Sequence, residues 1–151
     1  MTIKQKQAAN KVSKTKIEQK QCTAKEFTLL FSFKHISNKD DYNFRFFEKN
    51  KKNSEIVNAI IAFTEKIRVL SNDTWEVLNN LKRESGIEYI PVSEFKEYFI
   101  NSLNIPLTDD DKLISVRFNG QNIRFIMRRG TKCSRVAHIL GIDYDMKLYK
   151  H

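Results

Sequence analysis

Residues 112–151 read KLISVRFNGQNIRFIMRRGTKCSRVAHILGIDYDMKLYKH, and this stretch decides the fold because its apolar and polar side chains alternate in successive runs. Asn119-Gly120 predicts a two-residue type I′ turn, since both central positions of that turn require a positive φ. We expect a third strand over Arg135–Asp143, after a turn at residues 130–132. The pairing that follows from the Asn-Gly turn is Phe118 with Gln121, Val116 with Ile123 and Ile114 with Phe125.

One face of this predicted sheet is rich in arginine. Because side chains alternate along a strand, Arg117, Arg124 and Arg128 share the face opposite the apolar residues. Charged side chains are rarely buried completely, so we expect this face to contact water. His138 is expected on the apolar side of the third strand, as a hydrogen-bonded core residue.

The residues before this stretch predict a hairpin and helices. Aromatic residues alternate with polar ones in two runs, Glu26–Ile36 and Tyr42–Phe47, which predicts a second hairpin. Apolar spacings of three and four then predict helices, and Trp75 is expected to anchor the core. The expected helices run from Ser54 to Leu70, from an Asp73 cap to about Glu84 before Gly86, and from Glu94 to Leu103, with an extended piece over Glu88–Val92.

The predicted fold class is therefore α+β: an N-terminal β-hairpin, two to three helices, then a three-stranded antiparallel meander. Residues 1–22 are expected to form a flexible basic arm, because they hold almost no apolar side chains. Residues 23–151 are expected to form a single domain, since the chain is too short for two ordinary domains.

The formal net charge of +9 is distributed unevenly. Residues 1–25 carry a net +6, residues 26–111 a net −4, and residues 112–151 a net +7. Basic ends around an acidic middle favour a polyanion partner, most simply nucleic acid. The alternative explanation is solubility, together with a genome that favours lysine codons.

Several function classes lack their sequence signatures. The chain has no phosphate-binding loop, dinucleotide fingerprint or metalloprotease motif, and its two cysteines, Cys22 and Cys133, are far apart. We expect no cofactor, no metal and no membrane segment, and a reduced, cytoplasmic location. Asp143 and Asp145 lie where the last strand ends; a metal-dependent nuclease would need such carboxylates together with further acids, but in basic surroundings they are equally expected to pair with neighbouring arginine or lysine.

The basic sheet suggests metal-independent RNA cleavage. Such chemistry requires a base for the 2′-hydroxyl, a cation for the phosphate and an acid for the leaving oxygen. The candidate catalytic residues are Arg124, Tyr149 and His151. The candidate nucleic-acid-binding residues are Arg117, Arg128, Arg129, Lys132, Arg135 and Lys150. The alternative is a solvated sheet face with an exposed tail.

The order of elements adds a resemblance to a known family. Helices followed by three antiparallel basic strands and a terminal Tyr149-Lys150-His151 resemble the RelE/ParE-like toxins of bacterial toxin–antitoxin pairs. The resemblance implies an endoribonuclease that uses Arg117, Arg124, Arg128 and Tyr149, and an acidic antitoxin-like partner. The pattern FSFKHIS…TWEVL…VRF…ILGIDYDMKLY is also similar to a family of small uncharacterised proteins of bacteria, phages and mobile elements, which implies no activity.

The sequence thus predicts an RNA-binding protein, with toxin-like endoribonuclease activity as the sharper form of that hypothesis. The alternative hypothesis is a non-enzymatic interaction module of a phage or mobile element, which binds DNA or an acidic protein through the same face.

Overall fold

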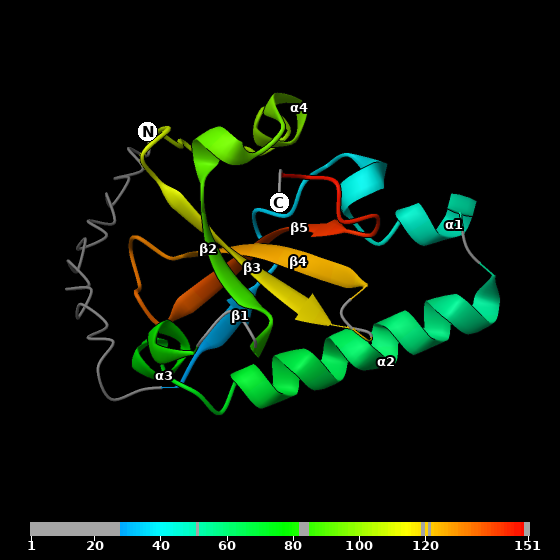
Figure 1. The fold of residues 1–151 in the computed structure, drawn as a ribbon, viewed down its shortest axis with the longest axis horizontal. Helices are drawn as coiled ribbons and strands as arrows, with labels where there is room; N and C mark the ends of the chain where they lie inside the picture. Colours follow the sequence, from blue (N-terminus) through cyan, green and yellow to red (C-terminus); the bar gives the residue numbers. More distant parts are fainter. Residues whose placement is uncertain (1–27, 51, 82–84, 119, 121, 150–151) are drawn as a thin grey trace, which may run out of the picture.

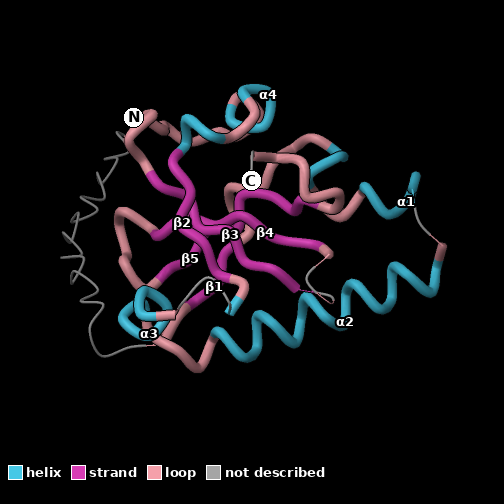
Figure 2. Tube along the Cα trace, in the orientation of Figure 1, coloured by secondary structure: helices cyan, strands magenta, loops and turns pink. Residues whose placement is uncertain are grey.

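A five-stranded mixed sheet forms the centre of the protein (Figures 1 and 2). The computed structural model describes residues 28–50, 52–81, 85–118, 120 and 122–149. The strand order across the sheet is β1-β5-β4-β3-β2. In chain order the elements are β1 (Leu30–Ser32), η1 (Asp40–Tyr42), α1 (Phe46–Asn50), α2 (Asn53–Leu70), α3 (Trp75–Asn80), β2 (Ile87–Pro91), η3 (Val92–Glu94), α4 (Glu97–Ile100), β3 (Lys112–Phe118), β4 (Ile123–Arg129) and β5 (Val136–Asp143).

The α+β class is confirmed, and so is the antiparallel meander of β3, β4 and β5. The sheet is larger than predicted, because β2 adds to β3 in antiparallel and β1 adds to β5 in parallel. The parallel pair joins Leu30 to Val136 and Ser32 to His138. No periodicity within either segment could reveal this pairing of distant residues.

The predicted N-terminal hairpin is wrong. Its first half contributes only β1, and its second half forms η1 and α1. The alternating aromatic residues of the second half pack in different directions: Phe46 stacks on Tyr144 with ring centroids 4.2 Å apart, and Phe47 is buried in the core. A run of six residues is too short for its period to distinguish a strand from a short helix.

The β3–β4 hairpin is confirmed, but its register differs by two residues. Phe118 pairs with Ile123, and Val116 pairs with Phe125, so the connection is longer than the predicted two-residue turn. Gly120 has a φ of +67°, as a turn glycine should, whereas Asn119 and Gln121 lie outside the described residues. A shift of two residues leaves every side chain on its predicted face, since only an odd shift exchanges the faces.

The first helix is confirmed over Asn53–Leu70, and no helix of the described chain is long and apolar enough to cross a membrane. The second begins one residue later than predicted, because Thr74 rather than Asp73 accepts the capping hydrogen bond from the Val77 amide at 3.3 Å. The third is broken into η3 and α4, since the backbone of Phe95 and Lys96 between them is extended, and the Lys96 amide donates to the Leu148 carbonyl at 2.8 Å.

Both faces of the sheet are covered, on one side by α2 and α3 and on the other by the η3–α4 segment together with Leu148 and Tyr149 (Figure 1). Trp75 is buried as predicted, and its indole nitrogen donates to the Ser134 carbonyl. The core of the first face includes Phe63, Trp75, Leu78, Val116, Phe125 and Ile139. The core of the second includes Phe95, Phe99, Leu113, Ile126, Leu140 and Leu148. The predicted water-exposed arginine face is therefore wrong over most of its length.

Candidate nucleic-acid interface

Arg117 and Arg124 are paired neighbours on β3 and β4, and both hold a buried carboxylate. Arg124 Nε donates to Asp143 Oδ2 at 2.8 Å, and these side chains are 0% and 4% exposed. Arg117 Nη2 donates to Glu88 Oε1 at 2.7 Å. The two guanidinium groups and the two carboxylates together carry no net charge. Removing such charges from water costs free energy, and only close, well-oriented contacts between them offset that cost.

Tyr149 lies on top of these ion pairs. The Arg124 guanidinium carbon is 3.8 Å from the centroid of the Tyr149 ring, and the Tyr149 hydroxyl is 3.1 Å from Glu88 Oε2 and 2.9 Å from Ser115 Oγ. Burial raises the pKa of the Tyr149 phenol, so the group stays protonated at neutral pH. We call Glu88, Ser115, Arg117, Arg124, Asp143 and Tyr149 the buried polar network.

The buried polar network is a structural device. Asp143 also accepts the amides of Lys147 and Leu148, each at 3.0 Å, and thereby fixes the C-terminal segment over the sheet. Arg124 and Tyr149 were predicted as catalytic residues and Arg117 as a phosphate ligand, but the structure buries Arg124 and Tyr149 and ties Arg117 to Glu88. The predicted pairing of Asp143 with a nearby cation is confirmed, and Asp145 lies 3.6 Å from Lys147 Nζ.

The remaining cations gather where β4 ends and β3 begins. Arg128 is half-buried and Arg129 is exposed, and both donate to main-chain carbonyls, Pro106 at 3.0 Å and Ser134 at 3.1 Å. A carbonyl does not neutralise a guanidinium, so both keep their positive charge. Lys112 and Lys132 are exposed beside them, whereas Arg135 donates to the Thr28 carbonyl at 3.4 Å. We call Lys112, Arg128, Arg129, Lys132 and Arg135 the basic end. Lys150 and His151 lie outside the described residues.

The basic end borders a cavity of about 380 Å³ with aromatic walls. Lys112, Arg128 and Arg129 line it together with Trp75 and Tyr89. The Tyr89 ring is 39% exposed, and its hydroxyl donates to Asn79 Oδ1. We call this space the aromatic–basic cavity. It offers a ring face for stacking beside cations for phosphate, which is the combination used to bind single-stranded nucleic acid.

A second cavity, of about 230 Å³, lies on the other side of Arg128 and Arg129. His35 and His138 line it with the two arginines, Asn104 and Thr131, among others, and we call it the histidine cavity. The imidazole centroids are 4.8 Å apart, in an edge-to-face arrangement. His138 is half-buried and its Nδ1 makes no hydrogen bond within the described chain, so the prediction of a hydrogen-bonded core histidine is wrong.

Acidic residues also approach the basic end. Asp111 accepts hydrogen bonds from the amide and hydroxyl of Thr108, at 2.8 and 3.2 Å. The backbone hydrogen bond from Thr108 is the main reason why the pKa of Asp111 is lowered, and the charge of Arg128 lowers it further. The Asp111 carboxylate thus bonds to its own loop, and its interaction with Arg128 is the electrostatic attraction of two separated charges.

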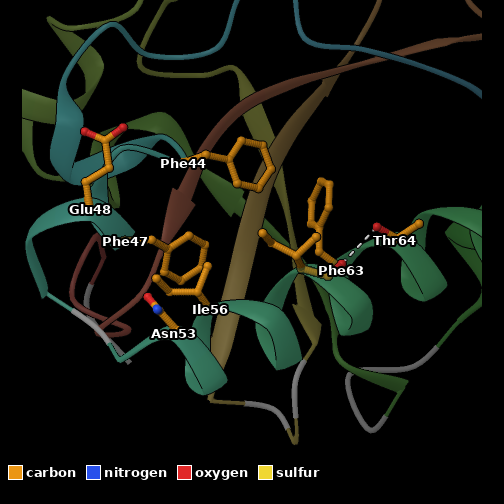
Figure 3. Close-up of a pocket in the computed structure, with 8 residues that line it drawn as sticks. Phe44, Phe47, Glu48, Asn53, Ile56, Phe63 and Thr64 are labelled. Carbon is orange, nitrogen blue, oxygen red and sulfur yellow. Dashed lines mark hydrogen bonds between the residues drawn. The ribbon is translucent and has the colours of Figure 1, made fainter.

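A third cavity, of about 580 Å³, lies between α1 and α2 and is mostly apolar (Figure 3). Phe44, Phe47, Ile56 and Phe63 form its walls, while Glu48 supplies its charge. The described residues that line it include neither lysine nor arginine.

Comparisons of the chain with family models, with curated proteins and with solved structures gave no match. Within the described residues, no three His, Cys, Asp or Glu side chains are grouped so that they could hold a metal ion.

Sequence reasoning found Arg128 and Arg129 but missed their neighbours. Lys112 could have been found, because antiparallel pairing of β3 and β4 brings the start of one strand to the end of the other. Tyr89 lies on the predicted extended piece but could not be placed beside β3 without the sheet order. His35 carried no signal, since its proximity to His138 depends on the parallel pairing of β1 with β5.

Proposed function

We propose that this protein binds single-stranded RNA at the basic end of the sheet. The observation that carries the proposal is that Arg128 and Arg129 line two cavities at once, one of which has aromatic walls. A backbone phosphate held by these arginines would direct its base toward the exposed face of Tyr89. Guanidinium groups suit this task because their planar donors match phosphate oxygens.

Single-stranded RNA fits these cavities better than a duplex does. The aromatic–basic cavity, of about 380 Å³, is large enough for an unstacked base, and paired bases of a duplex are not available to such a cavity. RNA is proposed rather than DNA because cellular RNA presents loops and ends with accessible bases. The acidic antitoxin-like partner expected from the toxin resemblance remains a prediction, and it would compete for the same cations.

The test is binding of a labelled random-sequence RNA, measured by fluorescence anisotropy over a series of salt concentrations. Arg128→Gln, Arg129→Gln and Lys112→Gln should each weaken binding and lower the slope of log K against log salt by about 0.7, the value for one phosphate contact on a single strand. Tyr89→Ala should weaken binding by about 1–3 kcal/mol, the usual contribution of one stacked base.

Arg68→Gln is the matched control, because Arg68 is an exposed arginine of α2 that pairs with Glu65 at 2.8 Å, away from both cavities. Its effect on the salt slope should be negligible. Equal losses in Arg68→Gln and Arg129→Gln would show that binding depends on net charge alone, and absence of binding at low salt would overturn the proposal. Stronger retention of duplex DNA than of RNA would favour the DNA-binding module.

A further inference from the structure

Two histidines that are remote in the sequence are brought together by the sheet. His138 belongs to β5, and His35 follows β1 in a turn. The loop after His35 is fixed against β5, because the Ser37 amide donates to the Leu140 carbonyl at 2.7 Å. The two imidazoles are consequently held in contact, with ring centroids 4.8 Å apart.

The turn after β4 orients the His138 ring. A methyl group at Gly130 would lie 3.3 Å from His138 Nε2 and 2.6 Å from the Cys133 carbonyl oxygen, so only glycine lets the chain pass this closely. Since His138 Nδ1 is buried, Nε2 is the nitrogen that can exchange a proton with a ligand. Arg129, the last residue of β4, and Thr131 of this turn line the histidine cavity with both imidazoles.

We propose that His35 and His138 form an acid–base pair that cleaves RNA at a phosphodiester held by Arg128 and Arg129. This inference rests on the proposed RNA binding and adds a reaction to it. The histidine cavity, at about 230 Å³, has room for a phosphodiester rather than a whole nucleotide, and the adjoining aromatic–basic cavity would take the base. Imidazole is the side chain best suited to proton transfer near neutral pH.

The reaction needs no metal and no co-reactant. His138 Nε2 accepts the proton of the 2′-hydroxyl while the 2′-oxygen forms a bond to phosphorus. The bond from phosphorus to the 5′-oxygen breaks, and that oxygen takes a proton from the imidazolium of His35. The products are a 2′,3′-cyclic phosphate and a 5′-hydroxyl, and Arg128 and Arg129 stabilise the negative charge that develops on the phosphate oxygens.

The protonation state of His138 agrees with its role as the base. Burial is the main cause that lowers the pKa of His138, and the charges of His35, Lys34 and Arg128 lower it further. Arg129 also lines the cavity, so among the described residues the charged groups that line it with His138 are cations. His138 is therefore neutral at pH 7 and able to accept a proton, and one protonated imidazole disfavours protonation of the other.

The test is incubation of purified protein with a random-sequence single-stranded RNA in EDTA, with end-group analysis of the products. Wild-type protein should release 2′,3′-cyclic phosphates, and DNA or 2′-O-methyl RNA should bind but remain whole. His35→Gln and His138→Gln should each slow cleavage by at least about 100-fold, the usual contribution of one acid or base, while RNA binding is retained. The rate of the wild type should fall at acid pH, where His138 becomes protonated.

The outcomes separate this inference from the proposed binding. RNA that is bound but not cleaved would overturn the acid–base pair and leave RNA binding intact, whereas absence of binding would overturn both. Cleavage that stops in EDTA, or that survives in His35→Gln, would also overturn the pair. His35 lies in a turn outside the strands, so its variant remains informative even if His138→Gln fails to fold, and Arg68→Gln should cleave like the wild type.

Discussion

Arg124 and Arg128 lie four residues apart on β4 and point to the same face of the sheet, but their surroundings are opposite. Arg124 is completely buried between Asp143 and the Tyr149 ring, whereas Arg128 lines two cavities and donates to a main-chain carbonyl. The difference arises because Tyr149 of the C-terminal segment covers Arg124, whereas Arg128, further along β4, borders two cavities. One strand thus holds an arginine that is buried in an ion pair and another that lines two cavities, and residue type alone does not distinguish them.

The largest effect should come from Arg124→Ala. Its removal leaves Asp143 buried without its cation, which should lower the free energy of unfolding by about 3–5 kcal/mol. Urea unfolding followed by circular dichroism measures this change. If Arg124→Ala lowers the free energy of unfolding no more than Arg128→Ala does, the two arginines contribute equally to stability and the contrast between them is wrong.

Tyr149→Phe, in the same buried polar network, should lower the free energy of unfolding by less than Arg124→Ala does. The ring stays over Arg124, but Glu88 and Ser115 lose the hydroxyl that lies within hydrogen-bond distance of both. Loss of one partner of a buried polar group should lower stability by about 1–3 kcal/mol. The same unfolding experiment applies, and RNA cleavage should persist in this variant. If a folded Tyr149→Phe protein no longer cleaves RNA, the Tyr149 hydroxyl takes part in the reaction.

His138, beside Arg128 in the histidine cavity, should make the free energy of unfolding weakly dependent on pH. The folded-state pKa of His138 lies below its ordinary value of 6.5, so the unfolded chain binds the proton first as the pH falls. Stability should therefore be fully present above pH 6.5 and decline as the pH falls below it. His138→Gln should flatten the curve in urea titrations at a series of pH values. Arg128→Gln should flatten it partly, because the Arg128 charge contributes to the shift.

The smallest effect on stability should come from Arg128→Gln itself. This side chain is half-buried beside a cavity, and its one hydrogen bond to a carbonyl is exposed, so unfolding should change by no more than about 0.5 kcal/mol. The same variant should lose RNA affinity. A destabilisation comparable to that of Arg124→Ala would mean that Arg128 also supports the fold and is unsuited to a purely ligand-binding role.

The sequence was informative wherever a structure depends on neighbouring residues. The period of α2 and the alternation along β3, β4 and β5 are local properties, and these elements lie where their patterns predict. The pairing of Leu30 with Val136 is set by tertiary packing, and so no local pattern contains it.

The same limit explains the error over the arginine face. Polar residues that alternate with apolar ones, such as Ser115 and Arg117 on β3 and Arg124 on β4, are typical of strands with one face in water. Here that face is covered, and the two arginines pair with Glu88 of β2 and Asp143 of β5. Glu88 was a usable signal, because it interrupts the apolar strand β2, whereas Asp143 is the last residue of β5. Arg128 and Arg129 were correctly placed together at the end of β4, but the aromatic ring and the imidazoles beside them required the full sheet.

The parallel pairing of β1 with β5 also bears on the order in which the protein can be made. Synthesis delivers β1 to the ribosome exit well before β5, so for a time the nascent chain holds β1 and the apolar side of α2 without the strand that joins them to the sheet. Sheet closure, and with it the contact of His35 with His138, must wait until β5 has been synthesised, long after β1 has left the ribosome.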